Sequence, residues 1–151
     1  MSGIEIHNRK AGRDYQFLEK IEAGIALSGT EVKSLRAGGG NFNDAFARIE
    51  QGEVWLYHFY IAPYDKGNRE NHEPRRKRKL LFHFREIKKL HQQVSQLGRT
   101  LVPLKGYFKN GRFKVLIGVG KGKTHGDKRQ DLKKRDVQRQ IDRTLAGRMR
   151  G

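Results

Sequence analysis

Five basic residues in a row, near the middle of the chain, are its densest group of side chains able to bind phosphate. They are Arg75, Arg76, Lys77, Arg78 and Lys79, and they follow a polar stretch, 64–74, that has no periodicity. An arginine guanidinium can hold a phosphate through two parallel hydrogen bonds. A run of charge is more often only solvated, but this one follows a long loop on a strongly basic chain. We therefore predict that this basic cluster contacts phosphate groups.

The charge of the whole chain supports a polyanionic partner. Its 151 residues include 33 Lys and Arg against 16 Asp and Glu, a formal net charge of +17. Such a surface releases counterions from nucleic acid and binds it with a steep dependence on salt. A membrane partner is not expected, because no long apolar run, signal peptide or myristoylation signal is found. Cysteine is absent, which excludes disulfides and thiolate metal sites. We expect a cytoplasmic protein.

Residues suited to catalysis or to cofactor binding form no recognisable constellation. The segment from Gly118 to Lys123 lacks the spacing of a phosphate-binding loop, and its small residues beside two lysines favour instead the close approach of an RNA backbone. No sequence pattern marks a catalytic nucleophile together with a general base. The six histidines are not spaced as metal ligands: His7, His58, His72, His83, His91 and His125. We therefore expect no enzyme activity, no cofactor and no metal.

Two further groups of side chains have roles that the sequence leaves open. On so basic a surface, Glu22 and Glu31 can organise neighbouring Arg and Lys residues or accept hydrogen bonds from base edges and ribose hydroxyls. Alternate positions of a strand face the core, so at least half of the rings in the most aromatic stretch are expected to be packing residues. The others could stack on bases. These rings are Trp55, Tyr57, Phe59 and Tyr60.

The periodicity of apolar residues predicts mostly short strands. Hairpins are expected over 45–61, turning at Gln51-Gly52, and over 100–120, turning at Asn110-Gly111. The segment 15–27 alternates up to a break at 22–24, which predicts two strands joined by a turn. Many short strands with a helix packed against them favour a mainly β fold, an antiparallel barrel with flanking helices.

The remaining segments are predicted as helices, loops and termini. A helix is expected over 84–97, ended by Gly98, and a shorter one over the segment that ends at Gly38. Gly38-Gly39-Gly40 predicts a flexible break, 64–79 a long loop, and residues 1–13 a loosely ordered start.

The composition changes after Lys123. Residues 127–151 hold nine basic and four acidic side chains, a net charge of +5, with a narrow apolar stripe at Val137, Ile141 and Leu145. A helix of this kind is marginal in water on its own. We expect a basic tail that is disordered when free and becomes helical on an RNA surface.

Several stretches, in the same order along the chain, resemble the small protein B family, bacterial proteins that bind transfer-messenger RNA. The longest is Gly-Thr-Glu-Val-Lys-Ser-Leu-Arg-Ala-Gly over 29–38. The others are Asn8-Arg9-Lys10-Ala11, Glu22-Ala23-Gly24-Ile25-Ala26-Leu27, Arg76-Lys77-Arg78-Lys79-Leu80-Leu81, Gly120-Lys-Gly-Lys123 and Asp127-Lys-Arg129. The resemblance covers about residue 6 to about residue 145. The chain departs from many relatives at Arg13, where they have a histidine, and at Gly126.

The resemblance implies a fold and a function. The fold is an oligonucleotide-binding type of barrel in residues 1–126, with a tail over 127–151 that folds into a helix on the ribosome. The implied function is to hold the tRNA-like domain of transfer-messenger RNA and to promote its delivery to stalled ribosomes, for ribosome rescue and peptide tagging (trans-translation). The implied partners of this monomer are that RNA, the decoding centre and messenger channel of the ribosome, and elongation factor Tu through the charged RNA.

The resemblance and the basic clusters together give the candidate site residues. The RNA-binding candidates are Asn8, Arg9, Lys10, Glu22, Lys33, Arg75, Arg76, Lys77, Arg78, Lys79, Leu81, Lys121, Lys123, Lys128 and Arg129. The tail candidates for ribosome contact are Lys133, Lys134, Arg135, Arg139, Ile141, Arg143 and Leu145.

Two alternatives stay open at the level of the residues. A general single-strand or ribosomal RNA-binding barrel would show little preference for tRNA-like structure, with its affinity set mostly by salt. A small nuclease would cleave RNA and lose that activity when one carboxylate or histidine is replaced.

Overall fold

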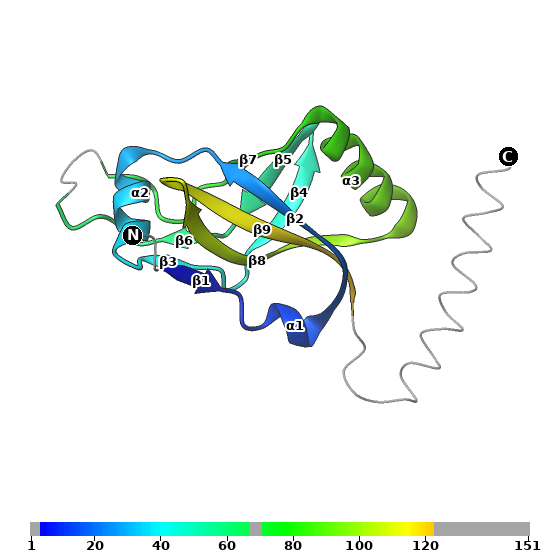
Figure 1. Cartoon of the computed structure of the whole chain (residues 1–151), viewed down its shortest axis with the longest axis horizontal. Coiled ribbons are helices and arrows are strands. Elements are labelled where there is room, and N and C mark those ends of the chain that lie inside the picture. Colours follow the sequence, from blue (N-terminus) through cyan, green and yellow to red (C-terminus); the bar gives the residue numbers. More distant parts are fainter. Residues whose placement is uncertain (1–3, 67–70, 123–151) are drawn as a thin grey trace, which may run out of the picture.

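The structure is a computed structural model that describes residues 4–66 and 71–122, and most of its ordered segments are antiparallel strands (Figure 1). The strands are β1 (Glu5–His7), β2 (Tyr15–Ile25), β3 (Gly40–Asn41), β4 (Phe46–Glu50), β5 (Glu53–Tyr57), β6 (Tyr60–Ile61), β7 (Arg78–Leu81), β8 (Thr100–Lys109) and β9 (Arg112–Gly122). The helices are α1 (Ala11–Asp14), α2 (Gly29–Arg36) and α3 (Phe84–Leu97). Among the described residues, no helix is long and apolar enough to cross a membrane.

The main sheet closes on itself into a barrel. Its strand order is β1-β8-β4-β5-β7-β2-β9, and β8 also pairs with β9, which closes the strands from β8 to β9 into a ring and leaves β1 attached to β8. β8 can take part in three pairings because its register shifts between Pro103 and Lys105. Leu101, before the shift, pairs with β4, whereas 105–107, after it, pair with β1. The predicted antiparallel barrel with flanking helices is confirmed.

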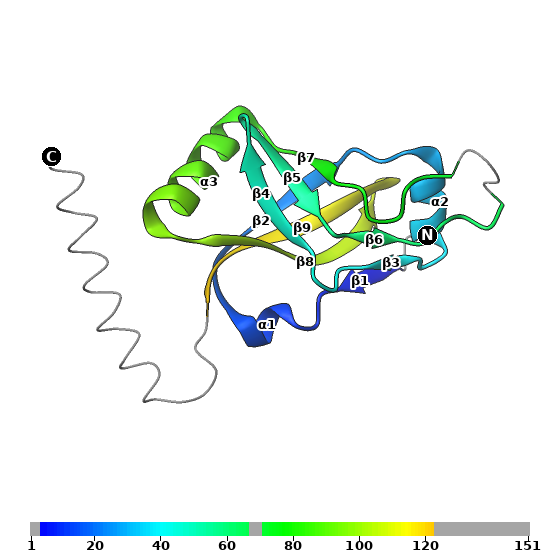
Figure 2. The same cartoon turned by 180° about the vertical axis from the view of Figure 1, so that it is seen from behind.

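The helices lie around this barrel. Figures 1 and 2 show α2 and α3 at opposite ends, with α1 beside the start of β2. The first turn of α2 forms a capping box in which Ser28 and Glu31 satisfy each other's backbone N–H groups. Gly98 ends α3 with a left-handed φ of 65°, as the sequence predicted. On the outside of β2, Glu19 accepts hydrogen bonds from Lys89 and Gln93 of α3, which ties that helix to the barrel.

The core is filled from alternating positions of the strands. Val54 and Leu56 of β5, and Val115, Ile117 and Val119 of β9, are buried, as the period of a strand requires. Both predicted hairpins are confirmed. The β8–β9 turn has positive φ at Asn110 (53°) and at Gly111 (78°), a combination that suits a type I′ turn.

Three predictions on local structure were wrong. β2 is one strand, because Ala23 and Ile25 continue the inward alternation through 22–24, and the small size of Ala23 disguised it. The described part of the predicted loose start, 4–13, is fixed to the barrel, since Ile6 is buried where β1 pairs with β8. The segment 38–40 is not a flexible break: an added Cβ at Gly40 would lie 2.5 Å from Ile6 Cδ1 and 2.7 Å from Leu35 Cδ2.

Two other segments are shorter or better anchored than predicted. The aromatic strand ends at Tyr57, because His58 has a φ of 60° and β6 begins only at Tyr60. The last two residues of the predicted loop belong to β7, and hydrogen bonds attach its described part to the rest of the protein. Asn71 hydrogen-bonds both backbone groups of Tyr64, and His72 contacts Thr30 of α2.

Candidate nucleic-acid interface

The basic cluster of 75–79 is divided by a buried carboxylate. Glu31 and Arg78 are both fully buried, and the Glu31 carboxylate accepts hydrogen bonds from the guanidinium groups of Arg76 and Arg78 and from the Ser28 amide. Arg78 also donates to the backbone carbonyl oxygens of Phe59, Pro74 and residue 76. This ion triad, Glu31 with Arg76 and Arg78, therefore joins α2 to β7 and to the loop that precedes it.

The triad corrects the prediction for Arg78. A side chain with no exposed surface cannot reach a phosphate, so Arg78 is a structural residue here. The Arg76 side chain is 38% exposed, but two of its N–H groups donate hydrogen bonds to Glu31. Burial raises the pKa of Glu31, but the hydrogen bonds from Arg76, Ser28 and Arg78 outweigh it and hold the pKa below its ordinary value of 4.5. The carboxylate is thus ionised at neutral pH, and it organises arginines, one of the two roles considered for it.

The other three members of the basic cluster lie outside the barrel. Arg75 and Lys77 are exposed, with the Arg75 guanidinium 5.0 Å from the ring centre of Tyr60 and the Lys77 ammonium 4.6 Å from that of Trp55. Lys79 lies 3.4 Å from Glu53 across the β5–β7 pair. These three cations remain candidates for phosphate contact.

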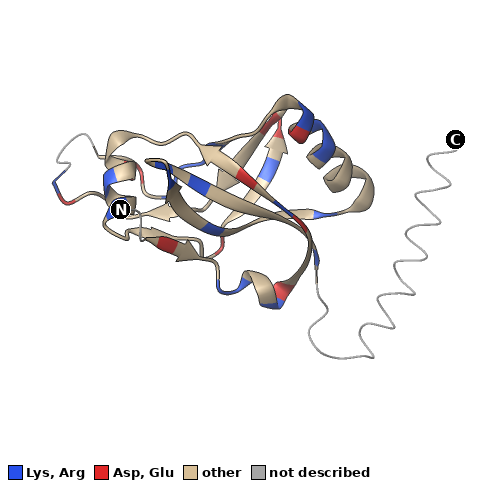
Figure 3. Cartoon of the chain, viewed as in Figure 1, with Lys and Arg blue, Asp and Glu red and all other residues tan. Residues whose placement is uncertain are grey.

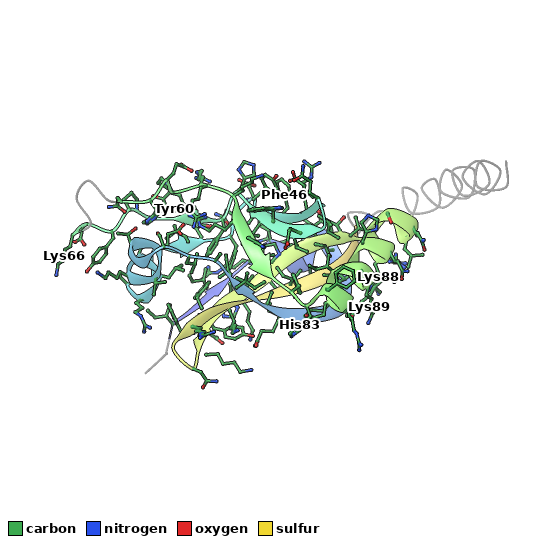
Figure 4. The ribbon with its side chains drawn as sticks, turned by 90° about the horizontal axis from the view of Figure 1, so that it is seen from above. Phe46, Tyr60, Lys66, His83, Lys88 and Lys89 are labelled. Carbon is green, nitrogen blue, oxygen red and sulfur yellow. The ribbon has the colours of Figure 1, made fainter. Side chains whose placement is uncertain are left out.

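The aromatic residues divide between the core and the outer surface. Phe59 is buried and stacks on Phe42 with ring centres 4.3 Å apart. Trp55, Tyr57 and Tyr60 are half-buried on the outside. Tyr57 stacks on Phe46 at 5.3 Å. Figure 4 shows Phe46 and Tyr60 on the same side of the molecule. Phe59 is thus the one core residue among these four rings, and the expectation that at least half of them pack in the core was wrong.

The glycines near the end of β9 were predicted to allow the close approach of an RNA backbone, but the structure gives them a packing role. An added Cβ would lie 2.5 Å from Phe17 Cδ1 at Gly118 and 3.0 Å from the same atom at Gly120. The absence of side chains there makes room for the Phe17 ring rather than for an RNA backbone. Gly122 has nothing within 4 Å of that position. The antiparallel pairing of β9 also rules out a nucleotide-binding unit, which requires a parallel strand.

A row of outward-facing residues crosses four strands on another part of the barrel. The pairing registers place Leu81 of β7 beside Gly24 of β2, Gly24 beside Lys114 of β9, and Lys114 beside Tyr107 of β8. With neighbouring strands about 4.8 Å apart, the row is about 14 Å long. Leu81 is 52% exposed. We call these four positions the outer row.

The carboxylate of Glu22 lies next to the outer row. Glu22 lies two positions before Gly24 on β2 and accepts hydrogen bonds from the Tyr107 hydroxyl and from Lys109, whose Nζ is 3.4 Å away. The hydrogen bond from Tyr107 lowers the pKa of Glu22 below its ordinary value of 4.5, against an opposing effect of burial. Burial and the nearby carboxylate raise the pKa of Tyr107 to about 12. The Lys105 ammonium lies 5.5 Å from the Tyr107 ring centre.

Four residues of this surface were not predicted from the sequence: Lys105, Tyr107, Lys109 and Lys114. A signal for them exists in the hairpin. Lys105, Tyr107 and Lys109 are two positions apart, so they share a face of β8, and a two-residue turn at 110–111 places Lys114 opposite Tyr107.

The other candidates lie apart from the outer row. The Asn8 side chain donates to the Pro103 carbonyl oxygen at 2.8 Å and so holds the chain before α1 to the register shift of β8. Lys121 pairs with Gln16, six positions along β2 from Glu22, or about 20 Å. Arg9, Lys10 and Lys33 are exposed. Figure 3, in which Lys and Arg positions are blue on the ribbon, shows the basic residues spread over several elements. The remaining candidates lie outside the described residues: Lys123, Lys128, Arg129, Lys133, Lys134, Arg135, Arg139, Ile141, Arg143 and Leu145.

A closed antiparallel barrel with basic and aromatic side chains on its outer surface, on a chain of net charge +17, is typical of nucleic-acid-binding barrel proteins. Comparison with known proteins gives the family. Residues 5–147 match the family model described as SmpB protein, so the chain belongs to the SmpB protein family, as its motifs suggested.

Relatives and a solved structure agree with this assignment. The chain is 55% identical over 148 residues to an SsrA-binding protein of Carboxydothermus hydrogenoformans, covering 98% of this chain and 99% of that protein. It is 52% identical over 144 residues to the SsrA-binding protein of Bacillus subtilis, covering 95% and 92%. A solved chain with a TM-score of 0.68 and 54% identity covers 85% of this chain and 92% of its own length. Its structure is described as "tmRNA-SmpB: a journey to the center of the bacterial ribosome".

Proposed function

We propose that this protein binds transfer-messenger RNA (SsrA RNA) and brings its tRNA-like domain to stalled ribosomes in trans-translation. The match to the SmpB protein family over residues 5–147 carries the proposal, together with relatives whose name states that they bind SsrA. The protein works by binding and positioning RNA and performs no catalytic step of its own. It acts in the cytoplasm as a monomer, and elongation factor Tu is a further partner through the charged RNA.

The tRNA-like domain binds, in this proposal, on the outer surface of β7, β2, β9 and β8. That surface combines the exposed Leu81, the ionised Glu22 and the cations Lys109 and Lys114. An apolar contact and a hydrogen-bond acceptor among phosphate-binding lysines allow discrimination by shape, which charge alone does not give. Arg75, Lys77 and Lys79 add phosphate contacts from the β5–β7 side.

The tail has a separate role in this proposal. Residues 127–151 contact the ribosome, in the decoding centre and the messenger channel, through basic side chains such as Arg135 and Arg139 and through the apolar Ile141 and Leu145. Residues 1–126 form the domain that holds transfer-messenger RNA. The similarity to a solved chain described with tmRNA and the bacterial ribosome supports both partners of this protein.

A competition experiment tests the function. The affinity of the protein for transfer-messenger RNA is measured at near-physiological salt with and without an excess of bulk tRNA. We expect the complex to survive the competitor, because a shaped site reads the tRNA-like domain. If bulk tRNA removes the protein in proportion to its concentration, the net charge alone drives binding. The protein is then a general RNA-binding barrel and the proposal is wrong.

A further inference from the structure

The Glu22 carboxylate is held by a residue of a strand that does not pair with its own. Glu22 is on β2 and Tyr107 on β8, with β9 between them, so their hydrogen bond spans the middle strand. Tyr107 donates to one carboxylate oxygen, and Lys109 approaches the other at 3.4 Å. About a third of the Glu22 side chain is exposed. The carboxylate thus has a fixed orientation and an open side towards solvent.

An ionised carboxylate in this position can only accept hydrogen bonds. The phosphate groups of RNA are acceptors as well, so they cannot bind Glu22 and are repelled by it. The groups of RNA that donate are the ribose 2′-hydroxyls and the N–H groups of bases that are not fully paired. Each carboxylate oxygen has two lone pairs, and the hydrogen bonds described above use one on each. A further donor can therefore be accommodated.

We propose that Tyr107 is a positioning residue that holds the Glu22 carboxylate in place as the acceptor for a donor group of the bound RNA, either a 2′-hydroxyl or a base N–H. The inference rests on the proposed function, since it assigns chemistry within the same RNA-binding surface. Lys109 and Lys114 bind the phosphates beside that donor group. Tyr107 itself does not contact the RNA in this proposal; its hydroxyl acts by donating a hydrogen bond to the Glu22 carboxylate.

A simpler role for Glu22 makes a different prediction. If the carboxylate only orders Lys109 and Lys114, its effect on affinity passes through two exposed cations and is screened by salt. If it accepts a hydrogen bond from the RNA, the effect stays similar from low to high salt and depends on the chemistry of one nucleotide. The experiment is designed around this difference.

The first part compares Tyr107→Phe, Glu22→Gln and the double variant for binding to a transcript of the tRNA-like domain at several salt concentrations. We expect Tyr107→Phe to weaken binding about tenfold with the salt slope unchanged, Glu22→Gln to weaken it at least as much, and the double variant to bind like Glu22→Gln. The matched control is Tyr57→Phe. It also removes a tyrosine hydroxyl that donates to a glutamate, Glu50, but Tyr57 is on β5, which lies across the barrel from β9. The control should bind like the wild type.

Tyr107→Phe binding within twofold of the wild type, or additive losses in the double variant, would overturn the positioning role. Urea unfolding of each variant separates a loss of fold from a loss of contact. Failure of the proposed function looks different: there, the wild type itself shows no preference for the tRNA-like domain over bulk tRNA.

The second part identifies the donor. Transcripts carrying randomly placed 2′-deoxynucleotides, or inosine in place of guanosine, are selected for binding, and the positions at which each analogue interferes are mapped. One interfering position in the wild-type map should disappear with both Glu22→Gln and Tyr107→Phe. A 2′-deoxy position indicates the ribose hydroxyl, and an inosine position indicates the exocyclic amine of a guanine. Identical maps for the wild type and both variants would refute a direct hydrogen bond to Glu22.

Discussion

Replacing Glu31 by Gln should destabilise the barrel by about 3–5 kcal/mol. The substitution keeps the shape of the side chain but removes the charge that compensates Arg78, which is fully buried. Removing one partner of a buried ion pair costs this much because the other charge stays in a low-dielectric environment without its counterpart. The carbonyl groups around Arg78 still accept hydrogen bonds from it, but they carry no charge.

The size of the effect follows from burial, so a partner that is only partly buried provides the comparison. Arg76 binds the same carboxylate but keeps 38% of its side chain in solvent. Arg76→Gln removes two hydrogen bonds to the buried carboxylate but leaves Arg78 to compensate its charge, so it should cost less than Glu31→Gln, about 1–3 kcal/mol. Small domains have a free energy of unfolding of about 5–15 kcal/mol, so the loss of Glu31 removes a large fraction of it.

Urea unfolding followed by fluorescence of Trp55, the single tryptophan, measures both variants. The dependence on pH gives a second test. Because the pKa of Glu31 is lower in the folded protein than its ordinary 4.5, its stabilising effect is complete above that value and is lost as pH falls through the folded pKa. The wild type should lose stability over this acidic range by a larger amount than Glu31→Gln. A cost below about 1 kcal/mol at neutral pH would refute the reasoning from burial.

Three further predictions concern packing, titration and the tail. Gly118→Ala should destabilise the barrel by about 1–3 kcal/mol, because the added Cβ would clash with the Phe17 ring. Gly122→Ala, where nothing lies within 4 Å of the added Cβ, should change the free energy of unfolding by less than about 0.5 kcal/mol. Equal urea midpoints for the two variants would contradict this prediction. Tyr107→Phe should raise the pKa of Glu22, since the hydrogen bond that lowers it most is lost, and an unchanged value in an NMR titration of the carboxyl carbon would contradict the geometry. Deleting 130–151 should leave affinity for transfer-messenger RNA nearly intact but abolish tagging on stalled ribosomes, and a collapse of affinity would show that the tail holds that RNA.

The sequence predicted the elements whose signals are local. The turn at Asn110-Gly111, the helix 84–97 and its end at Gly98 depend on residues that are close together in the chain, and the structure has all of them. The break predicted at 22–24 failed because Ala23 gives a weak apolar signal although it fills an inward position. The order of the first residues depends on the pairing of β1 with β8, about a hundred residues away, which local patterns do not encode.

The candidate site was harder to predict because residue type does not determine the role of a charge. The run 75–79 was one basic cluster in the sequence, but the alternation of β7 turns Arg78 inward and Lys79 outward. A buried Arg78 then requires a buried partner, and Glu31 supplies it from α2, 47 positions earlier. Tyr107 and the lysines around it were missed for the opposite reason: they are scattered along the chain and meet only when β8, β9 and β2 pair.

Glu22 and Glu31 show how the same side chain has two roles on one basic protein. Glu31 is enclosed, and both of its arginine partners come from this chain, so its hydrogen-bonding capacity is used within the fold. Glu22 has a tyrosine and a lysine as partners and an open side to solvent. Removing Glu31 should therefore weaken RNA binding only as far as it unfolds the protein. Removing Glu22 should weaken it with the fold intact, although the net charge rises and attraction to RNA at long range increases. Tighter binding of Glu22→Gln would mean that Glu22 is only a repulsive charge.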